Sequence, residues 1–339
     1  MSRNKAADVL KGYACLLVVF GHVIIGIRTS GGEIPLFMDT VEKFIWTFHI
    51  DLFMFLSGFV YSLTGGWRRH GTRLSFIGNK LLSLGLPYLI FSALYIAVNS
   101  LVPGVNNQSS LSEILMLWST PVAQYWFLYA LFWLFVFWCV IPDKIPNAAK
   151  TAALYAIFII LRYFGISMGI FDSSMNCVLA FGLGTCLSSI SVKKIPLFLR
   201  ISVLPLHVAV TVILIKVGAV GYIFVDDAVT VLGIFASVCF IDIISNLSPI
   251  QRTLDFVCKY SFQIYLLHTF FTAAARIALY RFGITSYILN VAVGLAVGLV
   301  FPVIIGKAAS LTPYLNWLFF PTRAFPQMKN GRTAGSGKA

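Results

Sequence analysis

The chain has 339 residues, of which 59% are hydrophobic and only 11% charged, and its formal net charge is +13. So few charged residues could not cover the surface of a soluble domain of this length, which excludes an ordinary soluble protein. In a membrane protein the basic excess is expected in loops on the cytoplasmic side, so we expect no nucleic-acid partner.

Ten apolar segments follow one another along the chain, each about long enough to cross a bilayer as a helix. Transmembrane β-strands are shorter and alternate in hydropathy. The sequence therefore predicts an all-α polytopic membrane protein whose first segment is a span and no cleaved signal peptide. The predicted spans are residues 10–28, 43–63, 81–101, 123–141, 151–166, 174–190, 198–215, 228–246, 259–280 and 285–305.

Basic residues are divided unequally between the two sides of these spans. With the N-terminus in the cytoplasm, 19 of the 25 lysines and arginines fall on the cytoplasmic side. The asymmetry predicts cytoplasmic termini and a multi-pass protein of the cell inner (plasma) membrane, in contact with the lipid bilayer. We expect one membrane domain over residues 1–320 and a basic, disordered cytoplasmic tail over residues 321–339.

The first predicted span carries its polar residues along one face. Lys11 and His22 are eleven positions apart, which returns them to within roughly 20° of each other around the helix and about 16 Å apart along it. Asp8 falls on the same stripe. We therefore expect a lysine near the cytoplasmic mouth and a histidine near mid-membrane to face the inside of the bundle.

The second predicted span brings further ionisable residues to the same depth. His22 precedes Arg28 by six residues and His49 follows Lys43 by six, so each histidine should lie about 9 Å inside its flanking cation. Asp51 is within one helical turn of His49. We expect His22, His49 and Asp51 to converge near the middle of the membrane.

Two loops are long enough to do more than connect spans. The loop of residues 64–80 has four cations and no carboxylate, which indicates either topological charge or a site for an anion; its cations are Arg68, Arg69, Arg73 and Lys80. The loop of residues 102–124 on the outer side is either a substrate lid or a plain connector.

A later span adds a third histidine to the expected group. His268 lies nine residues beyond Lys259, which places it about 13 Å from the cytoplasmic edge. Ionisable side chains inside spans usually mark a substrate, ion or proton path. The alternative is that each is simply hydrogen bonded to a neighbouring helix.

Other polar residues in the spans have simpler explanations. Snorkelling to a nearby span end accounts for Arg162, Asp242 and Arg276. His207, without a polar companion, is expected to be a packing residue. We expect no metal site, because no two ligand-type residues have the helical spacing that preorganises ligands.

Five segments together resemble the integral-membrane acyltransferase-3 family, whose members O-acylate polysaccharides and lipopolysaccharide sugars. The resemblance extends over most of the chain. The segments are, in order, "DVLKGYACLLVVFGH", "FHIDLFMFLSGFVY", "FIGNKLLSLGLPYLIF", "YWFLYALF" and "YSFQIYLLHTF".

The resemblance assigns roles only where positions match. His22 corresponds to the family's catalytic histidine, and Lys11 to its first-span basic residue, usually an arginine. The family's Arg-x-x-Arg is represented only by Lys80 and Ser83. Asp51 stands where proline is common in the family, so its candidacy rests on its chemistry alone.

The resemblance implies an acyl-CoA donor, most simply acetyl-CoA, in the cytoplasm, and a sugar or glycan hydroxyl as acceptor, with no tightly bound cofactor. A neutral histidine can take the hydroxyl proton near pH 7. His22 is therefore either this base or a covalent carrier of the acyl group. His49 or Asp51 would orient it or move a second proton. The remaining candidates are, for the CoA phosphates, Lys11, Arg69, Arg73 and Lys80, and for the channel and acceptor, Ser57, Trp126, Tyr265 and His268.

Two other classes of function stay open. A proton-coupled transporter would also place histidine and aspartate in the membrane, although no internal repeat is evident. A structural subunit is disfavoured by the cost of burying polar residues. The sequence predicts no particular protein partner.

Overall fold

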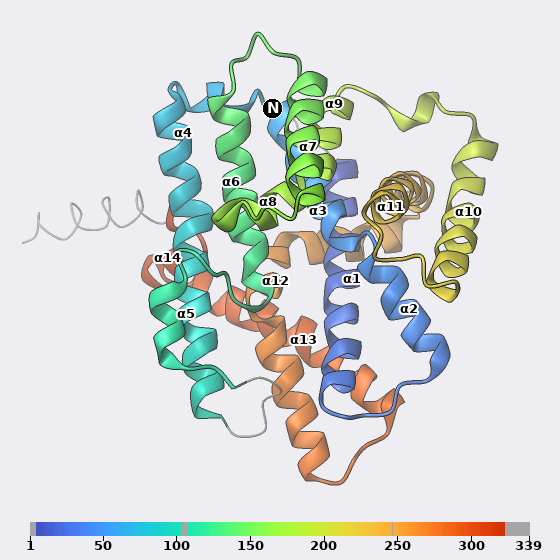
Figure 1. The fold of residues 1–339 in the computed structure, drawn as a ribbon. Helices are drawn as coiled ribbons and strands as arrows, with labels where there is room; N and C mark the ends of the chain where they lie inside the picture. Colours follow the sequence, from blue (N-terminus) through green and yellow to red (C-terminus); the bar gives the residue numbers. More distant parts are fainter. Residues whose placement is uncertain (1–4, 103–107, 246, 323–339) are drawn as a thin grey trace, which may run out of the picture.

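The computed structural model describes residues 5–102, 108–245 and 247–322, and over these residues the chain is a bundle of helices without β-strands (Figure 1). The predicted tail of residues 321–339 lies outside this description from residue 323 onward. The helices are α1 (Lys5–Thr29), α2 (Leu36–Trp46), α3 (His49–Leu63), α4 (Arg73–Lys80), α5 (Leu86–Leu101), α6 (Trp126–Val140), α7 (Asn147–Tyr163), α8 (Asp172–Asn176), α9 (Val178–Leu187), α10 (Leu197–Lys216), α11 (Ile223–Ile244), α12 (Ser248–Arg281), α13 (Tyr287–Ser310) and α14 (Pro313–Phe319).

The prediction of an all-α polytopic membrane protein is confirmed, and each predicted span falls on a helix or a helix pair. In the described part of the chain, eight helical segments are long and apolar enough to cross a membrane, and α8 with α9, bent by 48°, adds a ninth if the pair is one span. The remaining predicted span, residues 151–166, corresponds to α7, which is shorter at 17 residues. Which end of the bundle faces the cytoplasm stays a prediction.

Two further spans are interrupted. Helices α2 and α3 form one span, Leu36–Leu63, but the backbone leaves the helix at Phe48 (φ −148°). Helices α4 and α5 are joined by a π-helical turn at Leu81–Gly85. Because such breaks rotate the residues that follow them relative to a continuous helix, they decide which side chains face the inside.

Helix α1 lies inside the bundle and packs against α12, α13 and α3. The contact with α12 is close: a Cβ atom on Gly12 would lie 2.2 Å from the carbonyl oxygen of Leu254. Small residues allow such backbone approach between helices in a membrane. The close contact brings the ionisable residues of α1 and α12 onto facing sides.

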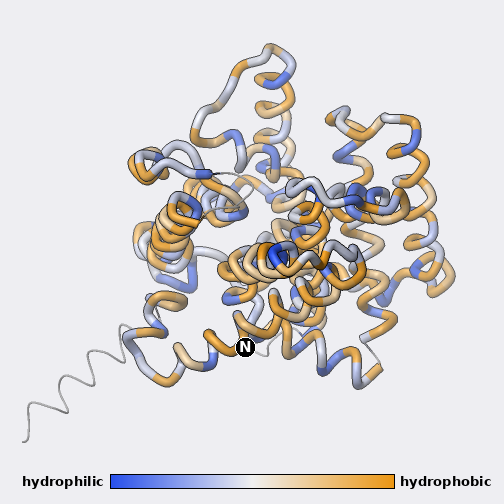
Figure 2. Tube along the Cα trace, turned by 90° about the horizontal axis from the view of Figure 1, so that it is seen from below, coloured by the Kyte–Doolittle hydropathy of each residue, from blue (hydrophilic) through white to orange (hydrophobic). Residues whose placement is uncertain are grey.

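The outer faces of the bundle are apolar, as a lipid-facing surface requires. Figure 2 shows hydrophobic residues along most of the tube, with hydrophilic residues interspersed. On α10, for example, Phe198, Ile201 and Leu206 are all more than half exposed. In water such a surface would be an aggregation hazard, whereas in lipid it has no desolvation cost.

A candidate active-site cavity along the first helix

A cavity of about 630 Å³ follows α1 through the bundle. Its wall includes Lys11 near one end of the helix and Thr29 at the other, a separation of roughly 27 Å along the helix axis. The rest of the wall comes from α2, α3, α5, α6, α12 and α13 and from the short segments that directly precede α5 and α6. We call its two ends the Lys11 end and the Arg276 end.

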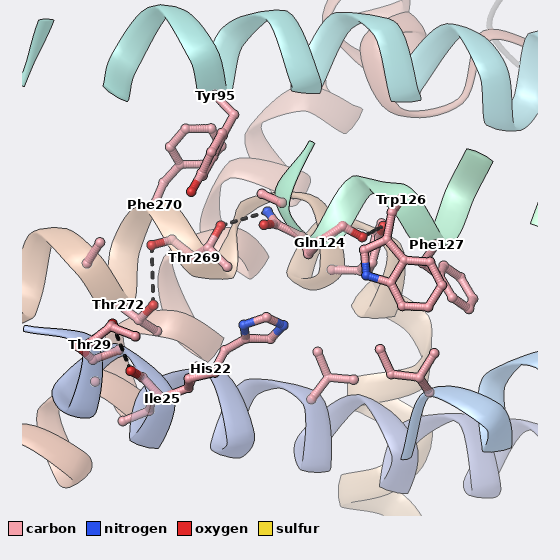
Figure 3. Close-up of a pocket in the computed structure, with 18 of the residues that line it drawn as sticks. His22, Ile25, Thr29, Tyr95, Gln124, Trp126, Phe127, Thr269, Phe270 and Thr272 are labelled. Carbon is pink, nitrogen blue, oxygen red and sulfur yellow. Dashed lines mark hydrogen bonds between the residues drawn. The ribbon is translucent and has the colours of Figure 1, made fainter. Parts of the chain in front are cut away.

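His22 lies between these ends and points into the cavity, toward Gln124 and Trp126 (Figure 3). Its ring centroid is 5.0 Å from that of His268 and 5.5 Å from that of Trp46. Lys11 lines the same cavity, as the helical spacing led us to expect. The structure thus places an imidazole, with space beside it for substrates, about midway along the cavity.

Asp8, expected on the same stripe, is not among the lining residues. Its carboxylate accepts a hydrogen bond from the Cys258 thiol of α12 at 3.7 Å. Because Asp8 faces α12, the face of α1 directed toward the cavity carries a lysine and a histidine without this carboxylate.

The histidines of α3 and α12 stand behind the cavity wall. His268 is fully buried, and its Nδ1 lies 2.8 Å from the carbonyl oxygen of Ile264. His49 has the same arrangement, with Nδ1 2.8 Å from the carbonyl oxygen of Ile45, and its ring contacts that of Trp46 at 4.8 Å. In neither histidine does Nε2 have a protein partner among the described residues.

These contacts fix the protonation of Nδ1 in each rear imidazole, since a carbonyl oxygen only accepts hydrogen bonds. Nδ1 must therefore carry the proton, and in the neutral ring Nε2 is left as an acceptor. His268, whose ring is adjacent to His22, can consequently accept an N–H from it. Each of the two histidines contacts a residue of the cavity wall, His268 the ring of His22 and His49 the ring of Trp46.

Asp51 does not join this group, which corrects the expectation from its depth. It lies two residues after His49, about 200° around α3, and is absent from the cavity wall. It is instead close enough to interact electrostatically with Asp227 of α11, whose carboxylate accepts a hydrogen bond from Tyr155. Asp51 therefore belongs to a second polar cluster, outside the described cavity wall.

Arg73, predicted to hold the donor, is tied to another loop. Its guanidinium donates to the carbonyl oxygen of Val140 at 2.6 Å, lies 3.7 Å from the Asp143 carboxylate and covers the ring of Trp67 at 5.0 Å. Arg68 pairs with the same carboxylate at 3.0 Å. These two cations hold loops together, so neither is part of the cavity wall.

Lys80 and Arg69 are placed differently. The Lys80 ammonium lies 3.7 Å from the centre of the Phe135 ring, and Arg69 is exposed but near enough to interact with it electrostatically. Neither lines the cavity, although Leu84, one helical turn beyond Lys80, does. Their predicted contact with the donor stays a prediction.

The other predicted channel residues line the cavity. Ser57 donates its hydroxyl to the carbonyl oxygen of Phe53 at 2.8 Å, and Tyr265 donates to that of Gln124 at 2.7 Å. Trp126 presents its indole to the cavity (Figure 3). The two hydroxyls already have backbone acceptors, so they shape the wall more than they activate a substrate.

Sequence reasoning missed several polar residues of the wall. Gln124 faces His22 (Figure 3) and donates its amide to the Thr269 hydroxyl at 2.7 Å. The only sequence signal was a glutamine directly before an aromatic span. The other missed polar or charged residues of the wall are Thr29, Tyr95, Asn99, Ser261, Thr269, Thr272, Arg276 and Asn290.

Two snorkelling interpretations were wrong. Arg276 is 7% exposed and directed inward, where its guanidinium donates to the carbonyl oxygen of Gly26. Asp242 forms an ion pair with Arg200. His207 fits the packing interpretation, since its ring lies between those of Phe44 and Phe48 at 4.7 and 5.0 Å. Depth along a span did not reveal which way a side chain points.

An all-helical membrane bundle with a histidine halfway along an internal cavity defines a membrane protein with an enclosed site for chemistry or passage. Comparison with protein families decides between these, because the model of the acyltransferase-3 family, described as an acyltransferase domain, matches residues 4–307. The chain belongs to this family.

A curated relative is similar over part of the chain. Nodulation protein NolL of Mesorhizobium japonicum is 29% identical over 136 residues, which are 40% of this chain and 35% of that protein. No solved structure gave a significant match.

Proposed function

We propose that the protein is an O-acyltransferase, in particular an O-acetyltransferase of the cell inner membrane. It moves an acyl group from cytoplasmic acetyl-CoA, or another acyl-CoA, to a sugar hydroxyl of an exopolysaccharide, a lipopolysaccharide or a lipid-linked precursor. The observation that carries the proposal is the cavity that connects Lys11, His22 and Arg276 along α1. Family membership favours this reaction over proton-coupled transport.

The cavity supports a direct transfer at His22. The thioester enters from the Lys11 end and the sugar hydroxyl from the Arg276 end, so both reach the imidazole in one continuous space. The neutral imidazole takes the hydroxyl proton as the oxygen attacks the thioester carbon. The carbon–sulfur bond then breaks, and the imidazolium returns the proton to the departing CoA thiolate.

The test is the transfer of label. Membrane vesicles that contain the protein are expected to move label from acetyl-CoA to an O-linked position on a surface-glycan extract, with release of an equal amount of free CoA thiol. Vesicles from cells with the empty vector provide the control. Proton-driven solute uptake without any transfer of label would contradict the proposal.

Lys11 is proposed to hold the donor by its phosphates. It is exposed at one end of the cavity, and a charge-assisted hydrogen bond to an anion contributes about 1.5–3 kcal/mol. We expect Lys11→Ala to raise KM for acetyl-CoA about tenfold or more, with little change in KM for the acceptor. Steady-state kinetics against each substrate measures this.

The matched control is Lys5→Ala. Lys5 is exposed on the same helix but does not line the cavity, so its loss should leave both constants near those of the wild type. If the Lys11→Ala protein depends on acetyl-CoA concentration as the wild type does, Lys11 does not bind the donor.

A further inference from the structure

The charges on the cavity wall have one sign. Among its lining residues in the described chain, Lys11 and Arg276 carry permanent positive charge, and no aspartate or glutamate is present. A permanent charge on a path through a membrane protein usually serves the substrate. Positive charge at both ends of a low-dielectric cavity favours an anionic group at both ends.

Arg276 is placed to act next to the reaction centre. It lies on α12 with only 7% of its surface exposed, and its guanidinium donates to the carbonyl oxygen of Gly26 on α1. Gly26 is four residues beyond His22, roughly 6 Å along the helix axis. This is about the length of one sugar ring, so a single acceptor residue can reach both side chains.

Asn290 of α13 provides an independent indication of a ligand at this end. It lines the cavity and is 3% exposed. Its amide nitrogen donates to the carbonyl oxygens of Ile284 and Ser286 at 3.2 and 2.9 Å, but its Oδ1 has no partner within the part of the chain that the structure describes. A buried acceptor without a donor is costly, and a hydroxyl of a sugar would satisfy it.

The surrounding wall also suits a carbohydrate. Gln124 and Thr269, hydrogen bonded to each other, and Thr272 lie near His22 in Figure 3. Amide and hydroxyl groups both donate and accept, as sugar hydroxyls do. The Arg276 end thus combines neutral polar groups with one fixed cation.

We propose that the Arg276 end binds an acceptor sugar that carries an anionic substituent, a carboxylate or a phosphate, and that Arg276 selects for it. The planar guanidinium matches either group with paired hydrogen bonds. This inference rests on the proposed acyl transfer for the identity of the bound sugar as acceptor. It makes Arg276 a specificity-determining residue, which a neutral hexose does not engage.

Binding and transfer test the inference separately. Quenching of tryptophan fluorescence, to which Trp46 and Trp126 of the cavity wall contribute, measures the affinity of the protein in nanodiscs for a methyl hexuronoside, a methyl hexoside 6-phosphate and the neutral methyl hexoside of the same sugar. We expect the wild type to bind at least one anionic glycoside tenfold or more tightly than the neutral one. The anionic glycoside that binds more tightly, the hexuronoside or the 6-phosphate, identifies carboxylate or phosphate as the substituent.

In Arg276→Gln the ratio of the affinities for the anionic and the neutral glycoside should fall to about one. Arg276→Lys keeps the positive charge but loses the paired N–H donors of the guanidinium, so it should retain part of this preference. The matched control is Arg281→Gln: Arg281 is exposed on the same helix and outside the cavity wall, so its loss should leave the preference unchanged. Equal or undetectable binding of all three glycosides by the wild type, or equal weakening of all three in Arg276→Gln, would overturn the proposal.

Different results would contradict acyl transfer and anion selection by Arg276. If the binding preference is found but no glycoside is acylated from acetyl-CoA, the acyl-transfer proposal fails and the anion site stands. If glycosides are acylated without any preference for the anionic ones, the transfer proposal stands and the role of Arg276 is wrong.

Discussion

Replacement of His22 by alanine is expected to lower kcat for acyl transfer at least 10²-fold, and up to about 10⁴-fold, the range that a positioned general base contributes. His22 points into the cavity from α1 between the two substrate entrances (Figure 3). Without its imidazole, no side chain of the described wall is a base near pH 7, so only a water molecule could take the hydroxyl proton. Release of CoA thiol and transfer of labelled acetyl group measure the loss.

The affinity for acyl-CoA should stay within a few-fold of the wild type in His22→Ala, because the proposed donor contacts are elsewhere. Equilibrium binding of labelled acyl-CoA checks this and shows that the variant is folded. His207→Ala is the matched control: His207 is also a buried histidine, 1% exposed, but packs between phenylalanines away from the cavity. Activity in His22→Ala within threefold of that in His207→Ala would contradict the assignment of His22.

The placement of His22 and Lys11 could be predicted because both lie on one uninterrupted helix. Helix α1 continues from Lys5 to Thr29, so the period of 3.6 residues per turn relates their directions directly. Hydropathy likewise located the spans, since a helix that crosses lipid requires a long apolar run. These are properties of a single segment, and the sequence contains them in full.

The direction of Asp51 could not be predicted in the same way. The apolar run of residues 43–63 reads as one helix, but the chain is broken at Phe48 between α2 and α3, which changes the rotation of the residues that follow. Asp51 instead lies close enough to Asp227, 176 positions away in the sequence, for the two carboxyl groups to interact electrostatically. Only the packing of α3 against α11 decides this contact.

Long-range contacts likewise decide the roles of the basic residues. Arg68 and Arg73 are in a loop without a carboxylate of its own, but Asp143 arrives from the loop between α6 and α7. Arg276 sits near the end of α12, where snorkelling was the economical interpretation, and turns inward because the carbonyl oxygen of Gly26 lies opposite. In both cases the partner lies far away in the sequence, Asp143 between α6 and α7 and Gly26 within α1, and no local pattern indicates it.

His268 is expected to act as a positioning residue for His22, so His268→Ala should lower kcat about 10- to 100-fold with little change in either KM. Its Nδ1 is held by the carbonyl oxygens of Ile264 and Tyr265 at 2.8 and 3.0 Å, which leaves Nε2 as an acceptor beside the His22 ring, 5.0 Å away between centroids. Accepting an N–H from His22 would fix its tautomer and aim its other nitrogen at the substrate. A misplacement of about 1 Å can cost 10²-fold in rate.

The variant His268→Gln separates a positioning role for His268 from a merely structural one. Glutamine can also donate to a carbonyl and accept with its side-chain oxygen, so if His268 orients His22, His268→Gln should recover part of the kcat that His268→Ala loses. His49→Ala is the matched comparison, since His49 has the same backbone contact but lies behind Trp46, and its loss should lower kcat less. If His268→Gln is as slow as His268→Ala, or if both raise KM instead of lowering kcat, then His268 supports the wall of the cavity without orienting the base.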